Sequence, residues 1–73
     1  MTTIDFTRNF PDQKPDQPLT YRFKDPSEAF DHFGAAVRSA ASFAEFVPCE
    51  TSFEMKMNDK VLKRVTITSE NFI

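Results

Sequence analysis

Few side chains in this sequence are suited to catalysis, because it contains one histidine, His32, and one cysteine, Cys49. A histidine can act as a general base or a pH-sensitive contact, and a cysteine can act as a nucleophile when a neighbouring group stabilises its thiolate. Cys49 follows Pro48 just beyond a predicted helix, where the helix dipole disfavours a thiolate. We therefore expect a partly exposed His32 on that helix, a buried or unreactive Cys49, and no enzymatic activity.

Metal ions and cofactors need clusters of ligands that the sequence does not provide. One histidine and one cysteine, far apart in the chain, do not make a zinc site. Asp12 and Asp16 lie in a segment without the glycine and the bidentate glutamate of a calcium-binding loop. A single glycine, Gly34, cannot build a phosphate-binding loop. The sequence therefore predicts no metal site, no cofactor and no small-molecule substrate.

The length and composition predict one small cytosolic domain over residues 1–73. A lone cysteine cannot form an intramolecular disulfide, and no stretch approaches the roughly 18 apolar residues of a membrane-spanning helix. The net charge of −2 argues mildly against non-specific binding to nucleic acids. A chain of this size buries only about 60% of its unfolded surface. A partner or a second copy that covers apolar surface would therefore matter for stability.

The best-defined element is a helix over residues 25–45. Asp25 is a favourable N-cap, Pro26 suits the first helical position, and Glu28 completes a capping box. The apolar residues that share one face, and that should cover a sheet, are Phe30, Phe33, Val37, Ala40, Ala41 and Ala44. Gly34 lies near this stripe, and we interpret it as a point where the helix approaches the sheet closely.

Two segments before the helix alternate as strands do. Residues 19–24 form the clearer strand, and the side chains on one of its faces are Leu19, Tyr21 and Phe23. Residues 4–7 also alternate, but chain ends often fray, so we expect no more than a short edge strand there. Residues 9–18 carry three prolines, which remove backbone donors, and should form an exposed loop.

A β-hairpin should follow the helix, with strands at residues 51–57 and 61–67. A loop of three residues keeps the apolar side chains on one face, whereas a two-residue loop would turn one strand over. The pairs that result are Met57 with Val61, Phe53 with Val65, Thr51 with Ile67 and Glu54 with Arg64. The sequence thus predicts an α+β fold in the order β-β-α-β-β. One helix would pack on one face of a small, mostly antiparallel sheet of three or four strands.

The predicted helix has a second apolar strip beside its core stripe. We call this strip the helix flank, and its members are Ala29, His32, Ala36 and Phe43. Small alanines beside a phenylalanine let another element approach closely, which suits a partner groove or a dimer contact. Phe46 could extend this strip, but we expect it to fold under the end of the helix, whereas Phe43 could equally belong to the interface or to the core. The helix flank is our candidate site for binding another protein or a second copy of the chain.

The outward face of the predicted sheet carries an excess of cations, and we call it the basic face. Its members are Arg22, Lys24, Lys56 and Arg64, with Glu54 as the opposing acid. Cations on a sheet can contact phosphates. However, RNA-binding sheets also display stacking aromatic rings, and here Tyr21, Phe23 and Phe53 are predicted on the opposite face.

These surfaces support two hypotheses about function. The leading one is a small protein-interaction module, such as an inhibitor, an adaptor or a regulatory subunit, that acts by surface binding without catalysis. Small accessory proteins of phages and plasmids, including inhibitors of host defence, often have this profile, although fold-level likeness alone carries no function. The alternative is a nucleic-acid-binding regulator that uses the basic face.

Overall fold

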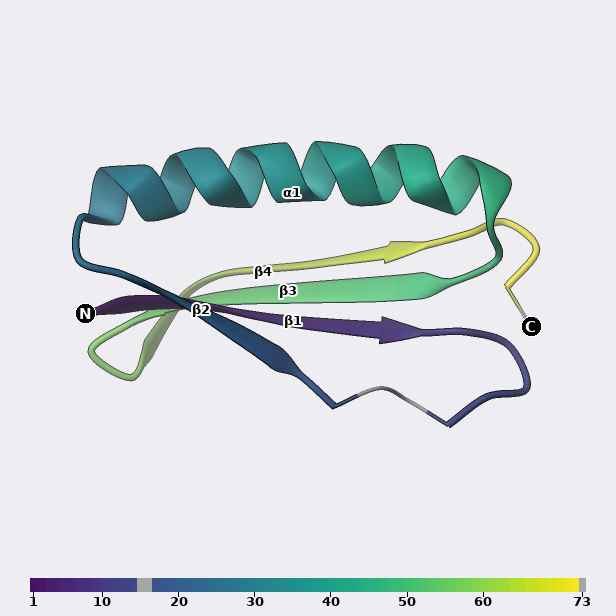
Figure 1. Cartoon of the computed structure of the whole chain (residues 1–73), viewed down its shortest axis with the longest axis horizontal. Helices are drawn as coiled ribbons and strands as arrows, with labels where there is room; N and C mark the ends of the chain where they lie inside the picture. Colours follow the sequence, from purple (N-terminus) through teal and green to yellow (C-terminus); the bar gives the residue numbers. More distant parts are fainter. Residues whose placement is uncertain (15–16, 73) are drawn as a thin grey trace.

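The computed structural model describes residues 1–14 and 17–72, and it shows one helix packed on one face of a four-stranded sheet (Figure 1). The elements are β1 (Thr2–Asn9), β2 (Leu19–Phe23), α1 (Pro26–Phe46), β3 (Glu50–Met57) and β4 (Lys60–Thr68). The strands lie in the order β2-β1-β3-β4, and all neighbours are antiparallel. The predicted α+β fold is confirmed. Among the described residues, no helix combines the length and the apolar character needed to cross a membrane.

β1 is a central strand, so the prediction of a short edge strand over residues 4–7 was wrong. It pairs with β2 from Thr2 to Phe6 and with β3 along its whole length. Thr2 and Ile4 face the helix, and each is 1% exposed. A hydrogen-bonded neighbour on both sides holds a segment that would fray if it were alone at the chain end.

The core lies between α1 and the two central strands. Its buried members include Phe33 of α1, Ile4 of β1, and Phe53 and Met55 of β3. The rings of Phe33 and Phe53 meet in an edge arrangement with centroids 5.9 Å apart, a geometry that the ring quadrupoles favour. The Phe33–Phe53 ring pair is therefore one of the contacts that join the helix to the sheet.

α1 is rotated about its axis relative to our prediction, so only part of the predicted stripe, including Phe33 and Val37, packs on the sheet. Its buried residues are Ala29, Phe33 and Ala40, whereas Phe30 is 45% exposed and Ala41 is also exposed. The predicted stripe is thus correct at Phe33 and Ala40 and wrong at Phe30 and Ala41. The small side chain of Ala29 lets the backbone of α1 lie close to the strands. A phenylalanine at this position would hold the helix farther away.

The start of α1 has the predicted N-cap at Asp25. The carboxylate of Asp25 accepts a hydrogen bond of 3.0 Å from the N–H of Ser27, which satisfies one unpaired donor of the first turn. The last turn closes where the N–H of Val47 donates to the carbonyl of Phe43 at 2.9 Å. The helix therefore ends at Phe46, one residue beyond the predicted boundary, and Val47 is its C-cap.

Gly34 does not mark a close approach between helix and sheet, and that prediction was wrong. A Cβ atom added there would meet only Nη1 of Arg38, at 3.6 Å, which is an ordinary contact. Nothing in the packing therefore requires a glycine at this position.

The β3–β4 hairpin has the predicted register over most of its length, but its turn has two residues and not the predicted three. The predicted pairs that form are Phe53 with Val65, Thr51 with Ile67 and Glu54 with Arg64. Met57, however, pairs with Lys60 rather than with Val61. Asn58 and Asp59 both have positive φ, 50° and 67°, as in a two-residue type I′ turn, whose twist matches that of the strands. A β-bulge farther along the pair then restores the apolar match.

The segment between β1 and β2 is exposed over much of its described part. Asp12, Gln13 and Lys14 are exposed, as are Gln17 and Pro18. Residues 15 and 16 of the predicted proline-rich loop lie outside the described residues.

Candidate interaction groove

A groove of about 330 Å³ runs between α1 and the helix-facing side of β1 and β2. We call it the flank groove. Its α1 wall is formed by His32, Ala36, Ser39, Ala40 and Phe43, and its sheet side by Ile4, Phe6, Arg8, Tyr21 and Phe53. Three members of the predicted helix flank, His32, Ala36 and Phe43, thus come together in one feature.

Ala29 does not belong to this surface, and its assignment to the helix flank was wrong. It is 0% exposed and lies in the hydrophobic core. The reason is the rotation of α1 described above, which places Ala29 where the helix comes closest to the sheet. The expectation that Phe46 folds under the end of the helix was also wrong, because its side chain is 82% exposed.

His32 closes the groove at the end near the start of α1. Its ring lies 5.2 Å, centroid to centroid, from the rings of both Tyr21 and Phe23 on β2. These contacts hold the edge strand to the helix. His32 is exposed, as expected, and its aromatic contacts explain its position by packing rather than by acid–base chemistry.

Arg8 lies at the opposite end of the groove. Its guanidinium carbon is 4.3 Å from the ring centroid of Phe43 and 5.0 Å from that of Phe6, within the range of cation–π attraction. Its Nε donates a hydrogen bond of 3.2 Å to the hydroxyl of Thr51. None of the salt bridges among the described residues involves Arg8. The groove is therefore apolar along its length and carries a fixed positive charge at one end.

Sequence reasoning missed Phe6 and Arg8 because it gave β1 so little weight. The alternation Thr2, Ile4, Phe6, Arg8 was visible in the sequence. Extending the period-two pattern as far as Asn9 would have placed Arg8 on the same face as the core residue Ile4.

An exposed apolar rim continues the groove along β2. Leu19 is 55% exposed and Tyr21 is 43% exposed, although both lie on the helix side of the sheet. One helix is too narrow to cover four strands, so the inner face of this edge strand stays in contact with water. The total accessible surface is 5206 Å², against roughly 4,600 Å² for a typical folded chain of this mass. Leu19 and Tyr21 therefore extend the apolar lining of the groove onto the exposed edge of the sheet.

The basic face is largely neutralised at its centre. Nε of Arg64 donates to Oε2 of Glu54 at 2.7 Å, and Nζ of Lys56 lies 3.2 Å from Oε1 of Glu54 and 3.7 Å from Oδ2 of Asp5. Arg64, and then Lys56, lower the pKa of Glu54 by hydrogen bonding to its charged form. Glu54, and to a smaller extent Asp5, raise the pKa of Lys56.

The other two members of the basic face, Arg22 and Lys24, are exposed at the β2 edge. The aromatic rings of the strands lie on the helix side, as predicted, where Tyr21 and Phe23 contact His32 and Phe53 contacts Phe33. The outward face therefore combines scattered, partly paired cations with hydroxyl groups and offers no strand aromatic for stacking.

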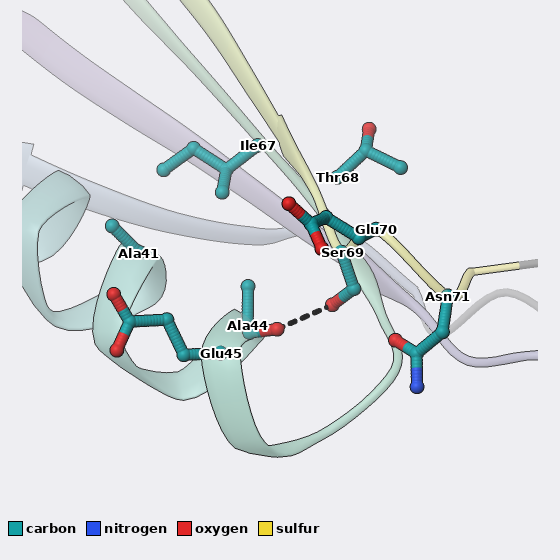
Figure 2. A pocket seen from close by; sticks show the side chains of 8 residues that line it. All are labelled: Ala41, Ala44, Glu45, Ile67, Thr68, Ser69, Glu70 and Asn71. Carbon is teal, nitrogen blue, oxygen red and sulfur yellow. Dashed lines mark hydrogen bonds between the residues drawn. The ribbon is translucent and has the colours of Figure 1, made fainter.

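A second cavity, of about 550 Å³, lies between the C-terminal half of α1 and the end of β4 (Figure 2). The hydroxyl of Ser69, which lines this cavity, donates a hydrogen bond to the carbonyl of Ala44 (Figure 2). We therefore interpret this side chain as structural. Cys49 lies close by with 0% exposure, which fits the expected buried thiol. Across residues 1–14 and 17–72, no group of three or more histidine, cysteine or acidic side chains is placed to hold a metal ion.

Comparison of the chain with protein-family models, with curated proteins and with solved structures finds no match.

Proposed function

We propose that the protein acts by binding another protein through the flank groove and the rim of β2, without catalysing a reaction. The observation that carries the proposal is the continuity of this apolar surface. It begins at Ala36 and Phe43 on α1, crosses Phe6 on β1, and ends at the exposed side chains of Leu19 and Tyr21. A folded protein of this size gains stability when such a surface is covered.

The biological role that fits this proposal is that of a small cytosolic inhibitor, adaptor or regulatory subunit, such as an accessory protein of a phage or plasmid. The cytosolic location is part of the proposal, because a lone reduced cysteine is typical of a reducing compartment. A second copy of the chain is the other occupant that the groove could accept, and it would make the protein a homodimer.

A nucleic-acid-binding regulator is the weaker alternative. It is supported by the exposed cations Arg22 and Lys24 on the β2 edge. The acids Glu54 and Asp5, which pair with Lys56 and Arg64, count against it. Reversing the charge at Arg22 and Lys24 should abolish a salt-sensitive shift of DNA or RNA in a gel if this alternative holds, and should leave protein binding through the groove intact.

The proposal can be tested with two matched serines on α1. Ser39 is exposed and lines the groove, whereas Ser42 is exposed and does not line it. Ser39→Arg should block the groove with little effect on the fold, because arginine is a good helix former. Ser42→Arg adds the same side chain elsewhere on the helix and serves as the control.

The three proteins would be immobilised and exposed to extract from the cells that carry the gene, and their retained proteins compared by mass spectrometry. We expect a protein that the wild type and Ser42→Arg retain and that Ser39→Arg loses. The solution molar mass of each variant, from light scattering, would show whether the partner is a second copy. Identical retention and identical mass for all three folded proteins would refute the proposal.

A further inference from the structure

We infer that the flank groove recognises a protein segment with a carboxylate next to a large apolar side chain, and that Arg8 binds the carboxylate. This inference rests on the proposed function and specifies its partner. The groove joins an apolar channel to one positive charge, so a segment with an apolar side chain beside a negative charge would complement it.

The position of Arg8 prepares it for such a carboxylate. Its guanidinium lies against the rings of Phe43 and Phe6. Within the described residues its side chain makes one hydrogen bond, from Nε to Thr51, so the two terminal nitrogens can donate to a ligand. Two parallel N–H donors match the geometry of a carboxylate. Because the rings and Thr51 already hold the side chain in place, little further conformational entropy is lost on binding.

The charge of Arg8 is also less screened than that of a surface arginine. Its side chain is half-buried, and apolar rings occupy the space that water would otherwise fill. The Coulomb attraction between two opposite charges is stronger in such surroundings than at an open surface. Among the described residues, no acid of the chain forms a salt bridge with Arg8. A carboxylate of the ligand would supply a negative charge to pair with Arg8.

The shape of the surface favours a protein segment over a small molecule. Small-molecule sites enclose most of their ligand, whereas this groove continues into the exposed side chains of Leu19 and Tyr21. A compound confined to the groove would leave Leu19, which does not line it, in water. β2 is also an edge strand, and no other strand of the described residues pairs with its outer side. An extended segment can pair with that edge while its side chains reach the groove.

The experiment selects binders from a displayed library of random linear peptides against the folded wild-type protein. We expect the enriched peptides to share an aspartate or glutamate within a few positions of a phenylalanine, leucine, isoleucine or methionine. The Kd of one such synthetic peptide is then measured for the wild type, Arg8→Gln and Arg38→Gln. Arg38 is an exposed arginine on α1 that does not line the groove, so it is the control for loss of a positive charge.

Arg8→Gln should weaken binding by at least about tenfold, and Arg38→Gln should change it little. A peptide in which the acid is replaced by its amide should bind the wild type about as weakly as the acidic peptide binds Arg8→Gln. Circular dichroism and the thermal midpoint would confirm that both variants fold. The inference is overturned if no peptide is enriched, if the enriched peptides lack acids, or if Arg8→Gln binds as well as the wild type.

These outcomes also separate the inference from the function on which it rests. If a peptide binds the Arg8→Gln protein but not the Ser39→Arg protein, the groove is supported as a protein-binding site. The same result would refute the claim that Arg8 binds a carboxylate of the partner. If the Ser39→Arg protein binds the peptides as tightly as the wild type does, then both the binding groove and the carboxylate contact of Arg8 are refuted.

Discussion

The hydroxyl of Ser69 lies 2.8 Å from the carbonyl oxygen of Ala44 in the last turn of α1 (Figure 2). The same hydroxyl is 2.9 Å from the carbonyl oxygen of Val47 and accepts a hydrogen bond of 3.0 Å from the N–H of Cys49. A single buried side chain after β4 therefore satisfies backbone groups at the end of the helix and just before β3. Such groups have no partner within the helix itself.

Replacing Ser69 with alanine should destabilise the protein by about 1–3 kcal/mol, because the buried N–H of Cys49 would lose its acceptor. Urea unfolding followed by circular dichroism would measure the change. Ser42→Ala is the control, since Ser42 is exposed on the same helix, and it should alter stability by no more than about 0.5 kcal/mol. Equal effects for the two substitutions would show that the Ser69 hydroxyl is not a structural link.

Gly34→Ala should stabilise the protein. The added Cβ makes only an ordinary contact, at 3.6 Å from Arg38, and alanine is better than glycine inside a helix by about 1 kcal/mol. For a domain of this size that corresponds to a rise of about 4–8 °C in the thermal midpoint. Ala35→Gly, at the exposed neighbouring position, should lower the midpoint by a similar amount. A fall in the midpoint of Gly34→Ala would mean that the glycine does have a packing role.

The parts of the fold that depend on local patterns could be predicted from the sequence. The N-cap at Asp25 and the alternation of residues 19–24 each involve neighbours in the chain, and both appear in the structure. The position of β1 between β2 and β3 depends on pairing between distant segments. No local pattern in residues 4–7 distinguishes a central strand from an edge strand, so that prediction failed.

The candidate site was predictable in part for the same reason. His32, Ala36 and Phe43 follow from helical spacing, and the structure brings them to one groove. Arg8 enters the groove only because β1 lies next to β2 and below α1. The rotation of α1, which took Ala29 into the core, depends on how closely the helix backbone approaches the strands, and a helical wheel carries no information about that distance.

The rotation of α1 can be tested with two alanines. Ala29 is 0% exposed, so Ala29→Leu would force extra methylenes into a filled core and should cost about 1–3 kcal/mol. Ala41 is exposed, and Ala41→Leu should change stability by no more than about 0.5 kcal/mol. Thermal unfolding of both variants would measure the difference. The predicted stripe, with Ala41 inside and Ala29 outside, requires the opposite ranking.

The ion pairs of Glu54 predict how stability depends on pH. The bond from Arg64, and then the contact with Lys56, lower the pKa of Glu54 in the folded protein. The stabilisation is therefore present above about pH 4.3, the ordinary pKa of glutamate, and it is lost as the pH falls through the lowered folded value. Conversely, Glu54 and Asp5 raise the pKa of Lys56. That contribution is present below the ordinary pKa of lysine, about 10.4, and is lost as the pH rises through the raised folded value.

Glu54→Gln should remove part of this pH dependence. A plot of its thermal midpoint against pH should therefore be flatter than that of the wild type at the acidic and alkaline ends. The carboxylate is on an open surface, so the difference should be small and should shrink at about 1 M salt, where the Debye length is about 3 Å. A salt titration of both proteins at neutral pH separates this effect from a change in packing, which salt would not remove. If the midpoints of the two proteins fall in parallel below about pH 4.3, then the pairs among Glu54, Arg64 and Lys56 contribute nothing to acid stability.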